Sequence, residues 1–292
     1  MVKAAGGFVL AAVLLLAAAP AEAQRGSWKE LTQRVGDIRV RYLEAGAGAR
    51  FLVFIPGWTM TAEVWREQIP YFAARDFHVI AFDPRSHGQT TKTEEGNTYL
   101  QHAADLHAFL KALKIEAPIL VGWSAGVATI LEYVASPEAI PPEKLALVDG
   151  SPAGFKDADY PGGATHQQMR AVLTGIEEDR AKWTDQFVRG MFRAAQGELR
   201  YRELAEGSLK TPTGAMIALL FDLFTGDHRP ALLRIQVPTL IVVPDGNRLL
   251  GEYLQSRIAG SKLEVIGDAG HALFLEKPQA FNQVLEAFLA TR

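Results

Sequence analysis

One serine stands where an apolar run of the sequence ends. Residues 119–128 read ILVGWSAGVA, in which Ser124 lies between Gly122 and Gly126. This G-x-S-x-G spacing indicates a strained turn from a buried strand into a helix, which lifts the serine hydroxyl clear of the sheet. The N-terminus of the helix that follows favours developing negative charge. Ser124 is therefore the candidate nucleophile for acyl transfer.

The candidate base is His271, in the segment GDAGHALF near the C-terminus. It follows a predicted strand and a glycine-rich turn, and a histidine so placed can take and return the serine proton. The chain has no cysteine, which excludes thiol catalysis, thiolate metal sites and redox motifs. The seven histidines show no metal-ligand spacing. The sequence thus predicts a reaction without a metal or another cofactor.

Short apolar runs alternate with helical patterns along the chain. Runs of this length suit strands that are buried on both faces of a parallel sheet, and the alternation favours an α/β fold with right-handed crossovers. Helical patterns cover 98–113, 125–136 and 278–292. The predicted strands lie within 38–46, 50–57, 77–90, 118–126, 145–152, 238–246 and 262–271.

Residues 152–232 interrupt this alternation, because they give helical patterns with no strand between them. The segment begins just after a strand end, where open α/β sheets place their ligands. We therefore expect a helical cap at 152–232, with the core formed by 24–151 and 233–292. Its many apolar side chains favour a substrate with an apolar acyl part.

Five segments resemble the α/β-hydrolase family, of the small serine esterase or haloperoxidase type. They are FIPGWTMTAEVW, FDPRSHGQT, GWSAG, LVDGSP and DAGHALFLEKPQAF, and the resemblance extends over roughly 38–290. It implies a mostly parallel central sheet flanked by helices, with a helical cap inserted after the sixth strand. It also implies the chain order nucleophile, acid, histidine.

The resemblance places the loop of His271 over Ser124. It implies an oxyanion hole made of two backbone N–H groups, one from Ala125 and one from Trp58. The family usually has His-Gly in the latter loop, where this chain has Pro56-Gly57. Because that family histidine is structural rather than catalytic, its absence does not change the assignment.

The acid of the triad is left open between two carboxylates. Family members often carry it after the seventh strand, but Asn247 occupies that slot here, in IVVPDGNRLL. Asp245 lies two residues earlier in the same loop. The other place used in the family is the end of the sixth strand, where this chain has Asp149 in LALVDGSP. Each aspartate could instead only stabilise its own turn.

The first 23 residues read as a secretory signal peptide. A lysine precedes an apolar stretch from Phe8 to Ala19, and an A-x-A cleavage signal follows. The apolar stretch is short for a membrane span, so we expect an exported protein, periplasmic or secreted, with no stable span after cleavage. A net charge of −3 and the lack of a basic stripe argue against a nucleic-acid partner.

The sequence therefore predicts a serine hydrolase that cleaves a small carboxylic ester or lactone through a Ser-His-Asp triad and an acyl-enzyme. Two further readings keep the fold and change the reaction, to a cofactor-free perhydrolase or a C–C bond hydrolase. A third reading is a non-catalytic binding protein, for which Asn247 in the usual acid slot is the only hint.

Overall fold

The computed structural model describes residues 28–291. The predicted signal peptide, residues 1–23, lies outside this range. Among the described residues, no helix has both the length and the apolar character that crossing a bilayer requires.

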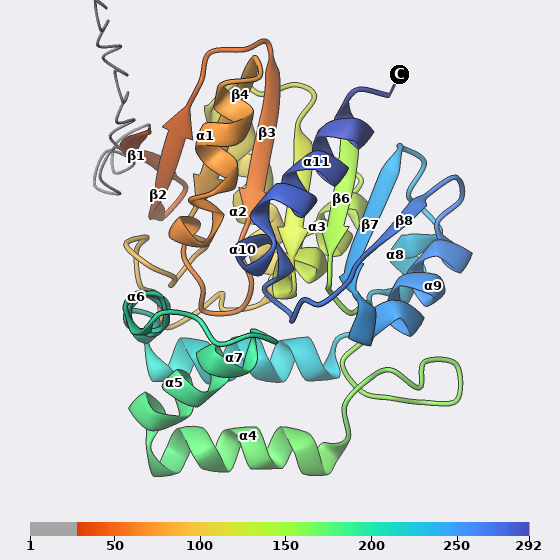
Figure 1. The fold of residues 1–292 in the computed structure, drawn as a ribbon. Coiled ribbons are helices and arrows are strands. Elements are labelled where there is room, and N and C mark those ends of the chain that lie inside the picture. Colours follow the sequence, from red (N-terminus) through yellow and green to blue (C-terminus); the bar gives the residue numbers. More distant parts are fainter. Residues whose placement is uncertain (1–27, 292) are drawn as a thin grey trace, which may run out of the picture.

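Within residues 28–291, eight strands form one sheet in the order β1-β2-β4-β3-β5-β6-β7-β8 (Figure 1). β2 is antiparallel to both β1 and β4, and the other neighbours pair in parallel. β5, β6 and β7 are buried along their whole length, which explains their uninterrupted apolar sequences. The predicted α/β-hydrolase fold class is confirmed. The strands are β1 Lys29–Val35, β2 Ile38–Ala45, β3 Arg50–Ile55, β4 Phe77–Phe82, β5 Ile119–Trp123, β6 Lys144–Val148, β7 Thr239–Pro244 and β8 Lys262–Ile266.

Helices cover both faces of the sheet (Figure 1). One face carries α1 (Gln68–Ala73), α10 (Leu273–Glu276) and α11 (Pro278–Leu289), with Trp65 and Phe274 stacked in its core at 4.1 Å between ring centroids. The second face is covered by helices whose apolar sides form a separate core cluster. Those helices are α2 Tyr99–Ala112, α3 Ala125–Ala135, α8 Arg229–Leu232 and α9 Arg248–Arg257.

The segment between β6 and β7 is helical, and Figure 1 shows α4–α7 lying across the ends of the strands. α7 packs its buried residues against Trp58 and the start of α3. α8, the last helix of the predicted cap range 152–232, packs instead on the sheet's second face through Ala231 and Leu232. The bounds are α4 His166–Glu178, α5 Arg180–Gly190, α6 Glu198–Leu209 and α7 Thr213–Thr225.

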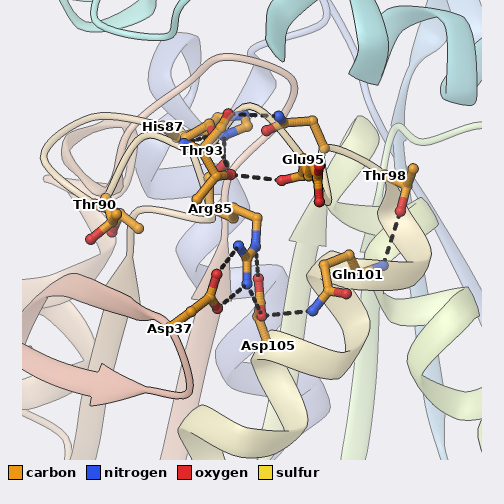
Figure 2. A network of polar contacts seen from close by, with 12 residues as sticks. Asp37, Arg85, His87, Thr90, Thr93, Glu95, Thr98, Gln101 and Asp105 are labelled. Atoms are coloured by element: carbon orange, nitrogen blue, oxygen red, sulfur yellow. Dashed lines mark hydrogen bonds and ion pairs between the residues drawn. The ribbon is translucent and has the colours of Figure 1, made fainter.

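Arg85 anchors the turn that follows β4 (Figure 2). Its guanidinium is 5 % exposed and pairs with Asp105 of α2 at 2.7 Å and with Asp37, in the β1–β2 turn, at 2.9 Å. The pairing lowers the pKa of Asp37. One buried cation therefore ties three elements together. The two carboxylates differ in burial, because Asp105 is 11 % exposed and Asp37 is 69 % exposed.

This difference in burial predicts different costs for two matched substitutions. Asp105→Asn should lower the free energy of unfolding by about 2 kcal/mol, because it weakens charge-assisted hydrogen bonds shielded from water. Asp37→Asn should cost clearly less than Asp105→Asn, since solvent screens an exposed pair. Urea unfolding of both variants measures the two costs. Equal costs would contradict the role given to burial.

Candidate active site

Ser124 forms the turn between β5 and α3 and has a left-handed backbone, with φ 55° and ψ −120°. This conformation is strained for a residue that carries a side chain. A Cβ added at Gly122 would lie 2.6 Å from the carbonyl oxygen of Gly126, and one added at Gly126 would lie 2.6 Å from that of Ile55. Both glycines of the motif are therefore required by the close packing of this turn.

His271 lies on the loop between β8 and α10, against the ring of Trp123. The indole Nε1 of Trp123 donates to the carbonyl oxygen of His271 at 2.9 Å. Because Trp123 directly precedes Ser124, this bond ties the histidine loop to the nucleophile turn. The His271 side chain is 30 % exposed and lines the same cavity as Ser124.

Asp149, at the end of β6, is the carboxylate that contacts His271. The two atoms His271 Nδ1 and Asp149 Oδ2 are 2.6 Å apart, and the aspartate side chain is fully buried. Since an ionised carboxylate only accepts hydrogen bonds, Nδ1 carries the proton in this contact. With the proton of a neutral ring on Nδ1, Nε2 has a free lone pair, as a general base needs.

Asp245, the alternative candidate for the acid, contacts an arginine instead of His271. Its carboxylate pairs with Arg193 of the inserted segment at 2.8 Å and is 40 % exposed. Arg193 lowers the pKa of Asp245 through this hydrogen bond and its charge. The structure therefore brings His271 together with Asp149 and leaves Asp245 in a separate ion pair.

Asn247 contacts the carboxylate of Asp149. Its Nδ2 donates to Oδ1 of Asp149 at 2.9 Å and to Oδ2 at 3.1 Å. The buried carboxylate is thus held by an amide on one side and an imidazole on the other. Sequence reasoning treated Asn247 as a departure from the acid slot and missed this role. The signal was present, since an amide is the neutral group that can donate to a carboxylate from that slot.

The predicted oxyanion loop lies directly beside Ser124. A Cβ added at Gly57 would lie 3.1 Å from the Cβ of Ser124. Trp58 follows, with its indole Nε1 donating to the carbonyl oxygen of Met216 at 2.9 Å and its ring against Trp183. Ala125 begins α3, so its N–H is one of the helix-terminal groups without an intrahelical acceptor.

A cavity of about 450 Å³ opens beside Ser124 and His271. Leu223 and Phe224 of α7 contribute to its apolar walls, and small residues within 153–164 line another part. Its lining side chains include no lysine or arginine. Among residues 28–291, no group of three or more histidine, aspartate or glutamate side chains is arranged to hold a metal ion.

Sequence reasoning also missed Glu276, which joins the histidine loop to the inserted segment. Its Oε2 accepts from the N–H of Gly270 at 2.7 Å and of Arg193 at 3.1 Å, and its Oε1 accepts from Ala194 N–H at 2.7 Å. The bonds to Arg193 and Ala194 connect residues 83 and 82 positions apart in the sequence. No local pattern around Glu276 marks it, so only the folded chain reveals this clamp.

The sequence matches the alpha/beta hydrolase family over residues 52–284. A putative non-heme chloroperoxidase of Synechocystis is 28 % identical over 263 residues, which cover 86 % of this chain and 95 % of that protein. An AB hydrolase superfamily protein of Bacillus subtilis is 28 % identical over 256 residues, with 85 % and 94 % covered.

Two solved structures share the fold. The bromoperoxidase of Bacillus anthracis superimposes with a TM-score of 0.85 at 24 % identity, covering 90 % of this chain and all of that one. An esterase of Exiguobacterium antarcticum gives a TM-score of 0.84 at 23 % identity, with 89 % and 99 % covered. At these identities the likeness concerns the fold.

The double contact of Asn247 with Asp149 generates a prediction for turnover. Asn247→Ala removes a donor to a buried carboxylate, which leaves that carboxylate less well oriented toward His271. We expect kcat on an activated ester to fall by about tenfold to a hundredfold, with KM nearly unchanged.

Asp245→Asn is the matched control, because it changes a polar side chain two residues away that pairs with Arg193 at the surface. It should leave kcat within about a factor of two. Steady-state kinetics on the folded variants measures whether the contact of Asn247 with Asp149 controls turnover. A loss in the control equal to that in Asn247→Ala would show that the loop, and not the amide contact, controls turnover.

Proposed function

The chain belongs to the alpha/beta hydrolase family, and on this basis we propose that it is a serine hydrolase that cleaves a small carboxylic ester or lactone. The observation that carries the proposal is the contact of His271 Nδ1 with the buried Asp149 carboxylate, in a cavity that also holds Ser124 on its strained turn. A nucleophile, a base and a group that orients the base are the parts that acyl transfer requires.

In the proposed first step, Ser124 Oγ attacks the carbonyl carbon while His271 Nε2 takes the hydroxyl proton. The resulting oxyanion accepts hydrogen bonds from the N–H groups of Trp58 and Ala125. Asp149 stabilises the imidazolium and keeps its orientation. His271 then gives the proton to the leaving oxygen, the C–O bond breaks, and an acyl-enzyme remains.

Water completes the proposed cycle. His271 takes a proton from the water as its oxygen attacks the acyl carbon, and the same proton returns to Ser124 Oγ when the ester bond to the enzyme breaks. The products are one carboxylic acid and one alcohol, or one hydroxy acid from a lactone. Every proton is moved by a single histidine, so no cofactor is needed in this proposal.

The cavity favours an uncharged substrate. Its polar lining consists of neutral groups such as Ser151, Tyr160 and Asn247, together with the Asp149 carboxylate. A carboxylate on the substrate would find no cationic side chain there and would approach a buried anion. Leu223, Phe224 and the exposed Leu249 supply apolar surface for a hydrocarbon part of the substrate. This part has to be small enough for the cavity, whichever half of the ester carries it.

Hydrogen peroxide in place of water is the second candidate for the same acyl-enzyme, and the product would be a peroxy acid. The names of the chloroperoxidase and bromoperoxidase relatives favour it. Peroxide delivers one proton to His271 as water does, so the step balances in the same way. Formation of a peroxy acid from an ester and peroxide by wild type, but not by a variant that lacks Ser124, would establish this perhydrolase reaction.

Ser124→Ala should abolish ester hydrolysis. We expect turnover of p-nitrophenyl butyrate to fall by about a thousandfold or more, because the acyl-enzyme cannot form. A fluorophosphonate probe should label wild type and leave the variant unlabelled, as read by mass spectrometry.

Two controls make this experiment decisive. Asp149→Asn should lose several orders of magnitude in kcat while Asp245→Asn stays active. A p-nitrophenyl ester with a terminal carboxylate on its acyl chain should be hydrolysed far more slowly than the neutral ester. If wild type hydrolyses no more than Ser124→Ala, the proposal is wrong, and the reading as a non-catalytic binding protein is favoured.

Export to the periplasm or the medium is a further part of the proposal, supported by the leader-like composition of residues 1–23. We expect protein recovered outside the cytoplasm to begin at Gln24, as cleavage after Ala23 requires. N-terminal sequencing measures this directly. Full-length protein found only inside the cell would contradict export.

A further inference from the structure

Thr59 has a strained backbone conformation that its surroundings must stabilise. It lies in the loop after β3, has φ 61°, and its side chain carries a branched Cβ, for which this left-handed region is strongly disfavoured. The residue is fully buried. Strain of this kind persists only where the surrounding structure stabilises it. The contacts of Thr59 therefore identify the residues that stabilise this loop.

Two side chains hold Thr59 by hydrogen bonds. Its N–H donates to Nε2 of His87, from the turn after β4, at 2.9 Å. Its hydroxyl bonds to the hydroxyl of Ser208, at the end of α6 in the inserted segment, at 2.7 Å. Both partners are buried.

His87 can accept this hydrogen bond only as a neutral imidazole. Nδ1 contacts the carbonyl oxygen of Arg85 at 2.9 Å, and a carbonyl only accepts, so the single proton of the neutral ring is on Nδ1. Nε2 is then an acceptor aimed at Thr59. Burial lowers the pKa of His87 to about 4, which keeps the ring neutral at pH 7.

The turn that carries His87 is itself firmly held. Figure 2 shows His87 beside Arg85, whose guanidinium pairs with Asp37 and Asp105. The ammonium of Lys92 bonds to the carbonyl oxygen of His87 at 2.8 Å and to two further carbonyls of the turn. The acceptor atom therefore has a fixed place in the core.

The contacts of Thr59 also affect the orientation of the peptide unit between Gly57 and Trp58. The carbonyl of Gly57 accepts from the N–H of Met60 at 3.1 Å. Because the peptide is trans, the N–H of Trp58 in the same unit points the opposite way. Relaxation of Thr59 out of its left-handed conformation would rotate the preceding units and move this N–H.

We propose that His87 is a positioning residue of the oxyanion hole: by accepting from Thr59 N–H it holds the strained loop in which Trp58 N–H is aimed at the substrate oxygen. This inference rests on the proposed function, because it assumes that Trp58 N–H stabilises an oxyanion. His87 touches neither substrate nor Ser124 and acts only through Thr59.

The test compares two amide replacements that differ in reach. In His87→Gln the side-chain oxygen can lie near the place of Nε2 and accept from Thr59, whereas the oxygen of His87→Asn lies one carbon short. His87→Leu has no acceptor. His102→Leu is the control for loss of a buried imidazole, because its ring lies 5.4 Å from that of His87 and is likewise buried.

We expect kcat on p-nitrophenyl butyrate to fall by about a hundredfold in His87→Leu and His87→Asn, with KM within about twofold, as for loss of an oxyanion donor. His87→Gln should recover most of kcat. A trifluoromethyl ketone, whose serine adduct places an alkoxide in the oxyanion hole, should bind more weakly by a similar factor. His102→Leu should keep wild-type kcat even if its melting temperature falls.

Equal kcat and equal ketone affinity in folded Asn and Gln variants and wild type would overturn the inference. If the leucine variant does not fold, the Asn–Gln pair still decides, because both replacements are polar and similar in size. Failure of the proposed function looks different. In that case wild type itself would neither hydrolyse the ester nor react with a fluorophosphonate.

Discussion

Backbone strain at the ends of three neighbouring strands is the constraint on which the candidate site depends. β3, β5 and β6 are adjacent in the sheet, and they lead into Thr59, Ser124 and Asp149, which have φ values of 61°, 55° and 43°. All three are left-handed residues with side chains, a conformation that stores energy and needs dense support. The support comes from glycines that let backbones approach and from buried hydrogen-bond partners. The strained residues and the candidate site lie at one edge of the sheet because parallel strands end there together.

The inserted helices are part of this support and do more than cover the site. Ser208 and Met216 contact the loop after β3 through Thr59 and Trp58, while the segment around Arg193 meets the loop of His271 through Glu276 and binds Asp245. The insertion therefore contacts both the loop after β3 and the loop that carries His271. Much of its apolar surface is used in packing against the core, and only a minor part lines the cavity.

Charge is distributed around the site according to burial. Asp149 is fully buried and is held by two side chains, an imidazole and an amide. Asp245, in a more exposed position, has a cationic partner instead. A buried carboxylate beside arginine would gain a partner that competes with the histidine for its oxygens. An amide donates to the carboxylate without adding a charge that would disfavour an imidazolium nearby.

The sequence by itself determined the fold class and the strained turn at Ser124, because both follow from local patterns. Buried strands read as short apolar runs, and the glycines around Ser124 mark close packing that only glycine permits. Local patterns could not identify the partner of His271. Asp149 and Asp245 each follow a strand that ends at the same edge of the sheet, and their local sequences are alike. Only the tertiary structure separated them, by bringing Arg193 to Asp245 and Asn247 to Asp149 across long stretches of chain. The supports of the oxyanion loop were hidden for the same reason, because the bonds of Thr59 to His87 and Ser208 join residues 28 and 149 positions apart.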